Sequence, residues 1–289
     1  MSEAALSRPA MAAAARPGRR VRPFSATGLP GFTAVAVAVF LLLYLPIAAL
    51  IVYSFNASNS IVNWGGFSLR WYEAAWNNRA VQDAAVRSLV IATVAALAST
   101  ALATLAAIGT TRQGRFRGRM AIWGTINLPL MVPEIVTGVA LLIVFGQVRA
   151  WTGYQGLGYL MLAHTAFCIP FAYLPIRARL ETMDRTLETA AADLYASPWQ
   201  AFRRVTLPLL APGIAAGMML AFVISLDDVI ITEFVKSAGQ DTLPTWMLGQ
   251  FRRTLTPEVN AISTAILALT LVPLTAFFLV TRRRPPTHR

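Results

Sequence analysis

Six long apolar runs constrain this chain more than any other feature. They fall at residues 32–55, 88–111, 120–148, 158–176, from 209 onward, and 261–280. A helix of about 20 apolar residues crosses the hydrocarbon core of a bilayer and satisfies its own backbone hydrogen bonds there. With 56% hydrophobic and only 13% charged residues, the chain is too apolar for a soluble domain of its size. The sequence therefore predicts an all-α integral membrane protein with six transmembrane helices.

The basic residues give the spans an orientation. The net charge is +12, but the basic side chains gather beside the apolar runs instead of lining one soluble face, which argues against nucleic-acid binding. Six spans put both termini on one side of the membrane. The N-terminal arm 1–31, the loop 112–119, the segment 177–204 and the tail 281–289 hold 18 of the 25 basic residues. By the positive-inside rule that side is the cytoplasm, and the arm 1–31 is predicted to be a disordered basic segment.

The segment 177–213 is the longest polar stretch between two apolar runs. Its apolar residues recur at spacings of three and four, which predicts one amphipathic helix lying on a surface. They are Leu180, Met183, Leu187, Ala190, Ala191 and Leu194. Ser197, Pro198 and Gln200 then form a helix start signal with a capping box. A second short helix is expected from there, ending before Leu207.

This segment, at 177–208, resembles the cytoplasmic coupling loop of ABC-importer permeases. The family pattern is Glu-Ala-Ala, three residues, Gly, nine residues, and Ile-x-Leu-Pro, and the spacing fits at every position. In the family this loop docks into a cleft of a separate ATPase subunit. The resemblance implies the same role for Glu188, Thr189, Ala190, Ala191, Asp193, Tyr195, Ala196, Ser197, Leu207 and Pro208.

Two residues depart from the family pattern. Thr189 replaces the glutamate, although Glu188 lies one residue earlier, and Tyr195 replaces the glycine. The left-handed conformation that glycine adopts freely would strain a tyrosine by roughly 1 to 2 kcal/mol. This substitution puts the geometry of the bend in question.

The source of energy for transport is not in this chain. A P-loop requires Gly-Lys followed by Ser or Thr, whereas the only lysine, Lys236, follows Thr-Glu-Phe-Val. ATP and magnesium are therefore expected on a partner ATPase, with no cofactor in this chain. An ion-coupled secondary transporter is the alternative class. The matched coupling loop and the lack of a detectable inverted repeat argue against it.

Four acidic residues in apolar surroundings are the candidates for a substrate path: Glu134, Asp227, Asp228 and Glu233. Each would cost roughly 2.5 to 3.5 kcal/mol at the bilayer centre, so such acids usually face a cavity or a cation. Asp228 is the first candidate, because it shares one helix face with Ser225 and Thr232.

The structural alternatives remain open. Glu134 could pair with Arg87 or Arg149, and Asp227 could cap a loop. His164 is expected to be a hydrogen-bonded core residue and Cys168 a small packing residue, with no metal site.

Residues 226–235, the TPEVNA at 256–261 and the PEIVTG at 133–138 resemble the polyamine-import branch of these permeases. The resemblance implies a type I ABC importer permease (MetI-like) fold over 32–280 in the bacterial inner membrane, with both termini cytoplasmic. It also implies a second permease subunit in a heterodimer, two ATPase subunits and a periplasmic polyamine-binding protein. Carboxylates suit the ammonium groups of putrescine or spermidine. Another cationic or opine-like solute remains an alternative.

Overall fold

The computed structural model describes residues 31–61, 63–113, 116–252 and 256–282. The predictions for the arm 1–31 and the tail 281–289 fall almost wholly outside this range. The chain divides into two units, residues 1–48 and 49–289. The first holds most of α1 (Phe32–Tyr53), an apolar helix that contains Pro46. All other elements lie in the second.

Helices dominate the described residues, where the one β-bridge joins Asn56 and Phe67. Six helical stretches are long and apolar enough to cross a membrane, which confirms the predicted number of spans. They are α1, α3 (Arg79–Arg112), α5 (Glu134–Thr152), α6 (Gly158–Thr182), the continuous run Pro198–Asp227 and α12 (Glu258–Arg282). Shorter helices, α2 (Arg70–Asn77), α10 (Ile230–Val235) and α11 (Leu243–Phe251), connect them.

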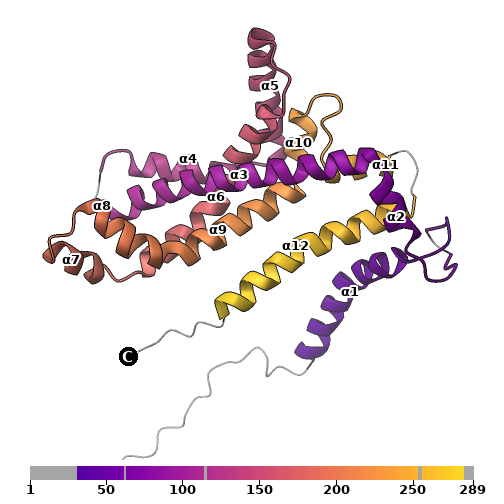
Figure 1. The fold of residues 1–289 in the computed structure, drawn as a ribbon, viewed down its shortest axis with the longest axis horizontal. Coiled ribbons are helices and arrows are strands. Elements are labelled where there is room, and N and C mark those ends of the chain that lie inside the picture. The colour runs from indigo at the N-terminus through magenta and orange to yellow at the C-terminus, as the bar shows by residue number, and fades with distance from the viewer. Residues whose placement is uncertain (1–30, 62, 114–115, 253–255, 283–289) are drawn as a thin grey trace, which may run out of the picture. The chain divides into compact units, whose positions relative to one another are not determined.

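The core of the second unit is formed by α3, α6 and α9 (Leu207–Asp227), which pack side by side (Figure 1). Small side chains make this possible: Ala95, Ala103 and Ala107 of α3 are fully buried. At Gly217 of α9, an added Cβ would lie 2.6 Å from the carbonyl oxygen of Ala172 on α6. Close backbone approach of this kind is how helices associate in lipid, and it places α3 inside the bundle.

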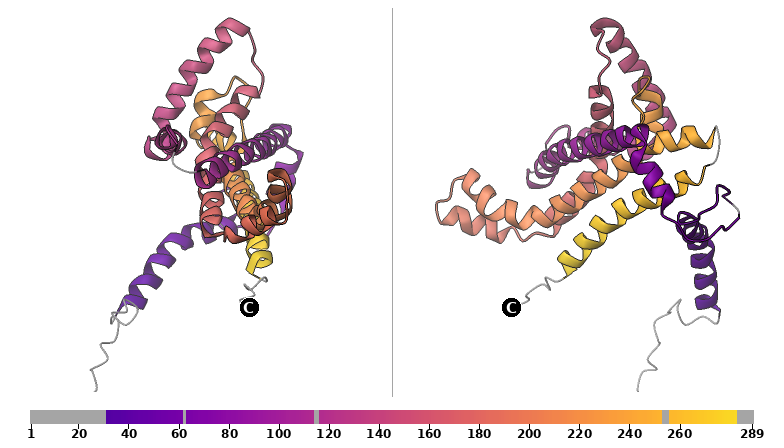
Figure 2. Two further views of the ribbon diagram at one scale, coloured as in Figure 1. Left: turned by 90° about the vertical axis from the view of Figure 1, so that its left-hand side faces the viewer. Right: turned by 45° about the vertical axis from the view of Figure 1, so that its right-hand side comes forward.

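The third span is not the single helix predicted for 120–148. It is divided into α4 (Arg119–Met131) and α5, with Val132 extended and Pro133 at the N-cap of α5. Proline lacks a backbone donor and forces the preceding residue out of the helical region, so Pro133 and the extended Val132 before it end α4. Glu134 therefore begins a helix instead of lying in the middle of one. α5 then leaves the core and packs on α10 (Figure 2).

The predicted amphipathic helix of the polar segment is also divided. α6 ends at Thr182 and α7 (Thr186–Asp193) follows a short break, in which Asp184 Oδ1 accepts a hydrogen bond of 2.9 Å from the Thr186 N–H. An aspartate that bonds the backbone locally competes with the helix. As a result Leu180 is buried in the core, whereas Leu194 is exposed.

The start of the next helix is confirmed and its end is not. Ser197 caps α8 (Pro198–Ala201) in a capping box with Gln200, as predicted. The helix does not stop before Leu207 but continues through a π-helical turn, η2 (Phe202–Thr206), directly into α9. The wider turn lies just before Pro208, whose ring would clash with a carbonyl in a regular α-helix.

Candidate coupling surface and acidic centre

Tyr195 forms the bend that follows α7. Its φ of 58° is the only positive φ of a non-glycine residue in the described part of the chain. The N–H of Tyr195 donates to the Ala192 carbonyl (2.9 Å) and the N–H of Ala196 donates to the Ala191 carbonyl (3.0 Å). This pair of bonds is a Schellman motif, which normally ends in glycine. Tyr195 thus adopts the left-handed geometry that glycine usually provides in this motif, so the bend forms in spite of the substitution.

Glu188 connects α7 to its neighbours. Its Oε1 lies 3.1 Å from a guanidinium nitrogen of Arg112 at the end of α3, and it accepts a hydrogen bond of 3.0 Å from the hydroxyl of Thr206 in η2. Thr189, at the position of the family's glutamate, donates its hydroxyl to the Arg185 carbonyl (3.2 Å). The Glu188 carboxylate, one residue earlier, therefore holds α7 against α3 and η2.

The outer face of the segment is apolar and exposed. The exposed fractions of Leu194, Tyr195 and Trp199 are 81%, 97% and 66%. Large apolar side chains clustered in solvent usually mark a surface where another protein binds. Trp199 was not among the predicted coupling residues, although a tryptophan inside a polar segment is a signal that could have identified it. We call these three residues the coupling surface.

Asp228 lies at the centre of a buried polar network. It is 6% exposed and follows the last residue of α9 in an extended conformation. Its Oδ1 accepts the N–H of Ile231 (3.2 Å), and its Oδ2 accepts both the N–H and the hydroxyl of Thr232 (2.9 and 2.8 Å). The carboxylate thus caps the first turn of α10.

His164 completes this network from α6. Its two ring nitrogens lie 2.8 Å from the hydroxyl of Ser225 and 2.9 Å from that of Thr232, and Nε2 lies 3.4 Å from Asp228 Oδ2. The predicted hydrogen-bonded core role of His164 is confirmed. Ser225, Asp228 and Thr232 do come together, but across the break between α9 and α10 instead of on one helix.

Two further acids lie near this centre without an ion pair in the described residues. Glu134, at the start of α5, has its carboxyl group beside that of Asp228. Asp227 is exposed and, among the described residues, is the only charged one lining a cavity of about 450 Å³ between α9, α11 and α12. The alternative pairings of Glu134 are not seen, because Arg87 pairs with Asp83 and Arg149 lies over the Tyr159 ring.

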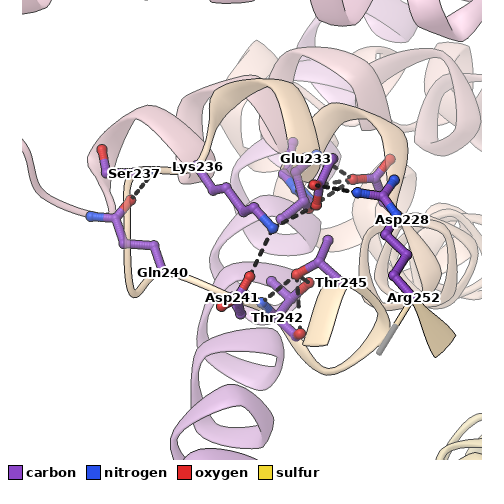
Figure 3. Close-up of polar contacts among 11 residues, drawn as sticks. Asp228, Glu233, Lys236, Ser237, Gln240, Asp241, Thr242, Thr245 and Arg252 are labelled. Carbon is purple, nitrogen blue, oxygen red and sulfur yellow. Dashed lines mark hydrogen bonds and ion pairs between the residues drawn. The ribbon is translucent and has the colours of Figure 1, made fainter. Parts of the chain in front are cut away.

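Glu233, in contrast, is neutralised by the only lysine of the chain (Figure 3). The Nζ of Lys236 lies 2.5 Å from Glu233 and 2.7 Å from Asp241, and Arg252 approaches Glu233 at 3.9 Å. Burial alone would lower the pKa of Lys236, but its hydrogen bonds to Asp241 and Glu233 outweigh that effect and raise it. Of the four predicted acids, Asp227 is thus the most accessible, Glu134 is half-buried, and the other two carboxylates already have partners.

Six apolar helices and a buried core of small residues define a membrane protein with several spans, and the exposed apolar bend offers a surface to a partner. Solved structures share this fold. A chain of a bacterial ABC transporter that imports alginate aligns with a TM-score of 0.62 at 14% identity, covering 87% of this chain and 94% of that one. A chain of the MetNI methionine ABC transporter aligns with a TM-score of 0.56 at 16% identity, covering 74% and 95%.

Sequence comparison gives the family. Residues 99–284 match the family of binding-protein-dependent transport system inner membrane components. The chain belongs to this family. It is 39% identical to the putrescine transport system permease protein PotI of Escherichia coli, over 84% of this chain and 88% of that protein. It is 38% identical to the spermidine/putrescine transport system permease protein PotC of Haemophilus influenzae, over 85% and 94%.

Proposed function

We propose that this chain is one of two permease subunits of an importer that carries a polyamine, putrescine or spermidine, into the cytoplasm. The observation that supports this most is Asp227, an exposed carboxylate without a counter-ion in the described residues, facing a cavity of about 450 Å³. A carboxylate in apolar surroundings needs a cation to offset its desolvation. The similarity to putrescine and spermidine permeases indicates which cation it receives.

The energy comes from a partner. Two ATPase subunits bind ATP and magnesium, and the coupling surface of Leu194, Tyr195 and Trp199 docks on one of them. This arrangement requires the segment 177–208 and both termini to face the cytoplasm, as the distribution of basic residues predicts. A periplasmic binding protein delivers the polyamine from the other side.

Movement of the segment 177–208 reaches the core through two covalent connections and one ion pair. α7 follows α6 after a short break and η2 continues into α9, while Glu188 joins α7 to Arg112 of α3. Since α3, α6 and α9 form the core, displacement of this segment by the ATPase would tilt the bundle. Alternating access then exposes Asp227 and Glu134 to one side of the membrane at a time.

The test is uptake of labelled putrescine by cells that lack other polyamine importers. Asp227→Asn removes the accessible charge, and we expect uptake to fall about tenfold, which corresponds to roughly 1.4 kcal/mol. Asp83→Asn, in an exposed pair with Arg87, is the matched control and should leave uptake unchanged. Copurification of the partner subunits shows that the variants assemble.

Normal uptake by Asp227→Asn and by the double variant with Glu134→Gln would contradict a cation path through this centre. Asp228→Asn does not serve as the primary test. It weakens the cap of α10, so lost uptake could follow from misfolding alone.

A further inference from the structure

A polar cavity of about 470 Å³ lies where α3 ends, α4 begins and the segment 183–185 leads into α7. Three arginines line it: Arg112, Arg119 and Arg185. We call it the arginine pocket. None of these side chains belongs to the coupling surface or to the acidic centre.

The arginines have unused hydrogen-bonding capacity. Each guanidinium group carries five N–H donors. The Nε of Arg112 is buried and has no hydrogen-bond partner in the described chain, although the same side chain pairs with Glu188. Arg185 donates one hydrogen bond of 2.6 Å to the Thr111 carbonyl, and Arg119 forms no ion pair with any described residue. A buried donor without an acceptor is costly, so a ligand with several acceptor oxygens would stabilise the pocket.

The acids at the pocket are already occupied. Glu181 lies 2.7 Å from Arg177 on its own helix, and Asp184 accepts the Thr186 N–H. That hydrogen bond lowers the pKa of Asp184. Among the described residues, three cationic and two anionic side chains line the pocket, so the balance of charge favours an anion.

A second cavity, of about 560 Å³, shares Arg119 with the arginine pocket. It is mostly apolar, and Phe116, Met120 and Trp123 are among its lining residues. Met120 and Trp123 are exposed although both are large and apolar. A charged pocket beside an apolar groove, at the end of a membrane-spanning helix, has the same division of polarity as a phospholipid. A free phosphate would leave the groove empty.

We propose that the arginine pocket binds the phosphate headgroup of an anionic phospholipid whose acyl chain lies along Phe116, Met120 and Trp123. Guanidinium groups bind phosphate through parallel charge-assisted hydrogen bonds, and basic pockets between membrane helices hold anionic headgroups. Arg112 also contacts Glu188 of α7, so the lipid stabilises the end of α3 against the coupling segment. The proposal does not depend on which solute the permease carries.

The test uses the full chain purified in its complex with its partner subunits, and native mass spectrometry as lipid is added. We expect the complex to retain phosphatidylglycerol in preference to phosphatidylcholine. Arg119→Gln should weaken retention of phosphatidylglycerol roughly fivefold, the effect of one basic group near an anionic lipid. Arg117→Gln, from the same loop but outside the pocket, is the matched control and should bind as the unchanged protein does. Arg119→Lys keeps the charge and should retain most of the binding.

Three results would overturn the proposal. The unchanged complex could show no preference for phosphatidylglycerol, or Arg117→Gln could weaken retention as much as Arg119→Gln. Inorganic phosphate could also displace phosphatidylglycerol at equal concentration, which would assign the pocket to a free phosphate. Arg119 makes no ion pair in the described chain, so its loss should not unfold the protein, and the melting temperature of each variant verifies this.

Discussion

Tyr195 combines backbone strain with almost complete exposure. Its φ of 58° costs a residue with a Cβ roughly 1 to 2 kcal/mol, and at 97% exposure its side chain gains little from packing inside the chain. The strain would be offset if the ring were buried against another protein. A residue of this kind is explained better by docking than by folding.

Substitutions at Tyr195 should separate these two effects. Tyr195→Gly relieves the strain, but its greater freedom in the unfolded state offsets roughly 0.5 to 1 kcal/mol of the gain, so the melting temperature should rise slightly or stay the same. Tyr195→Val should lower the free energy of unfolding by about 1 kcal/mol, because β-branched residues tolerate positive φ poorly. Thermal unfolding of the purified permease measures both. Equal stability of the valine and glycine variants would contradict the left-handed geometry.

The sequence predicts only part of the surroundings of Asp228. The spacing of Ser225, Asp228 and Thr232 correctly indicated that their side chains meet. It could not show that α9 ends between them, or that His164, more than 60 residues earlier, supplies the ring that joins them. The sequence favoured Asp228 over Asp227. The cavity that Asp227 lines is formed by the packing of α11 and α12, which the sequence does not show. Packing between elements distant in the sequence therefore makes Asp227 accessible, whereas Asp228 is buried.

In the segment 177–208 the sequence predicted one helix boundary correctly and missed another. The capping box of Ser197 and Gln200 is a local signal, and the structure contains it. The break at Asp184 depends on a competition between Leu180, which is buried in the core, and a local side-chain hydrogen bond, and periodicity alone cannot resolve it. The third span shows the same limit, because Pro129 is accommodated within α4 whereas Pro133 ends it.

Loss of Glu188 should uncouple the two activities of the assembled importer. Glu188→Lys places a cation against Arg112 and removes the acceptor of Thr206, so α7 loses its bond to the core. We expect uptake to fall more than fivefold while ATP hydrolysis continues. Asp83→Lys, in an i,i+4 pair with Arg87 outside this segment, is the control, since exposed pairs contribute about 0 to 1 kcal/mol. Transport and hydrolysis that fall in proportion for Glu188→Lys would show that the contact does not transmit movement.

Trp199 should be a major contributor to docking. A tryptophan buried in an interface typically loses 2 kcal/mol or more on truncation, which corresponds to about thirtyfold in affinity. We expect Trp199→Ala to weaken binding of the ATPase subunits by about that factor, measured by titration of the purified ATPase onto the permease pair. Trp76→Ala, at a tryptophan on α2 that is more exposed than Trp199, should bind normally. If both variants behaved alike, the coupling surface would be wrongly assigned.

At the scale of the whole molecule, the number of spans and the all-α class followed from hydropathy alone, because only helices or closed barrels satisfy the backbone in lipid. The arrangement of α3, α6 and α9 did not follow, since it rests on close contacts of small residues such as Gly217 with Ala172. The exposed apolar helices and the exposed bend indicate a subunit that is completed by other chains.

We propose that a separate ATPase subunit drives transport through this permease. The most direct measurement is putrescine accumulation by proteoliposomes that contain the complete complex and the binding protein, with ATP on the side of the ATPase subunits. We expect accumulation that requires ATP hydrolysis and continues when an uncoupler removes every ion gradient. Accumulation driven by an ion gradient without ATP, and abolished by the uncoupler, would contradict it.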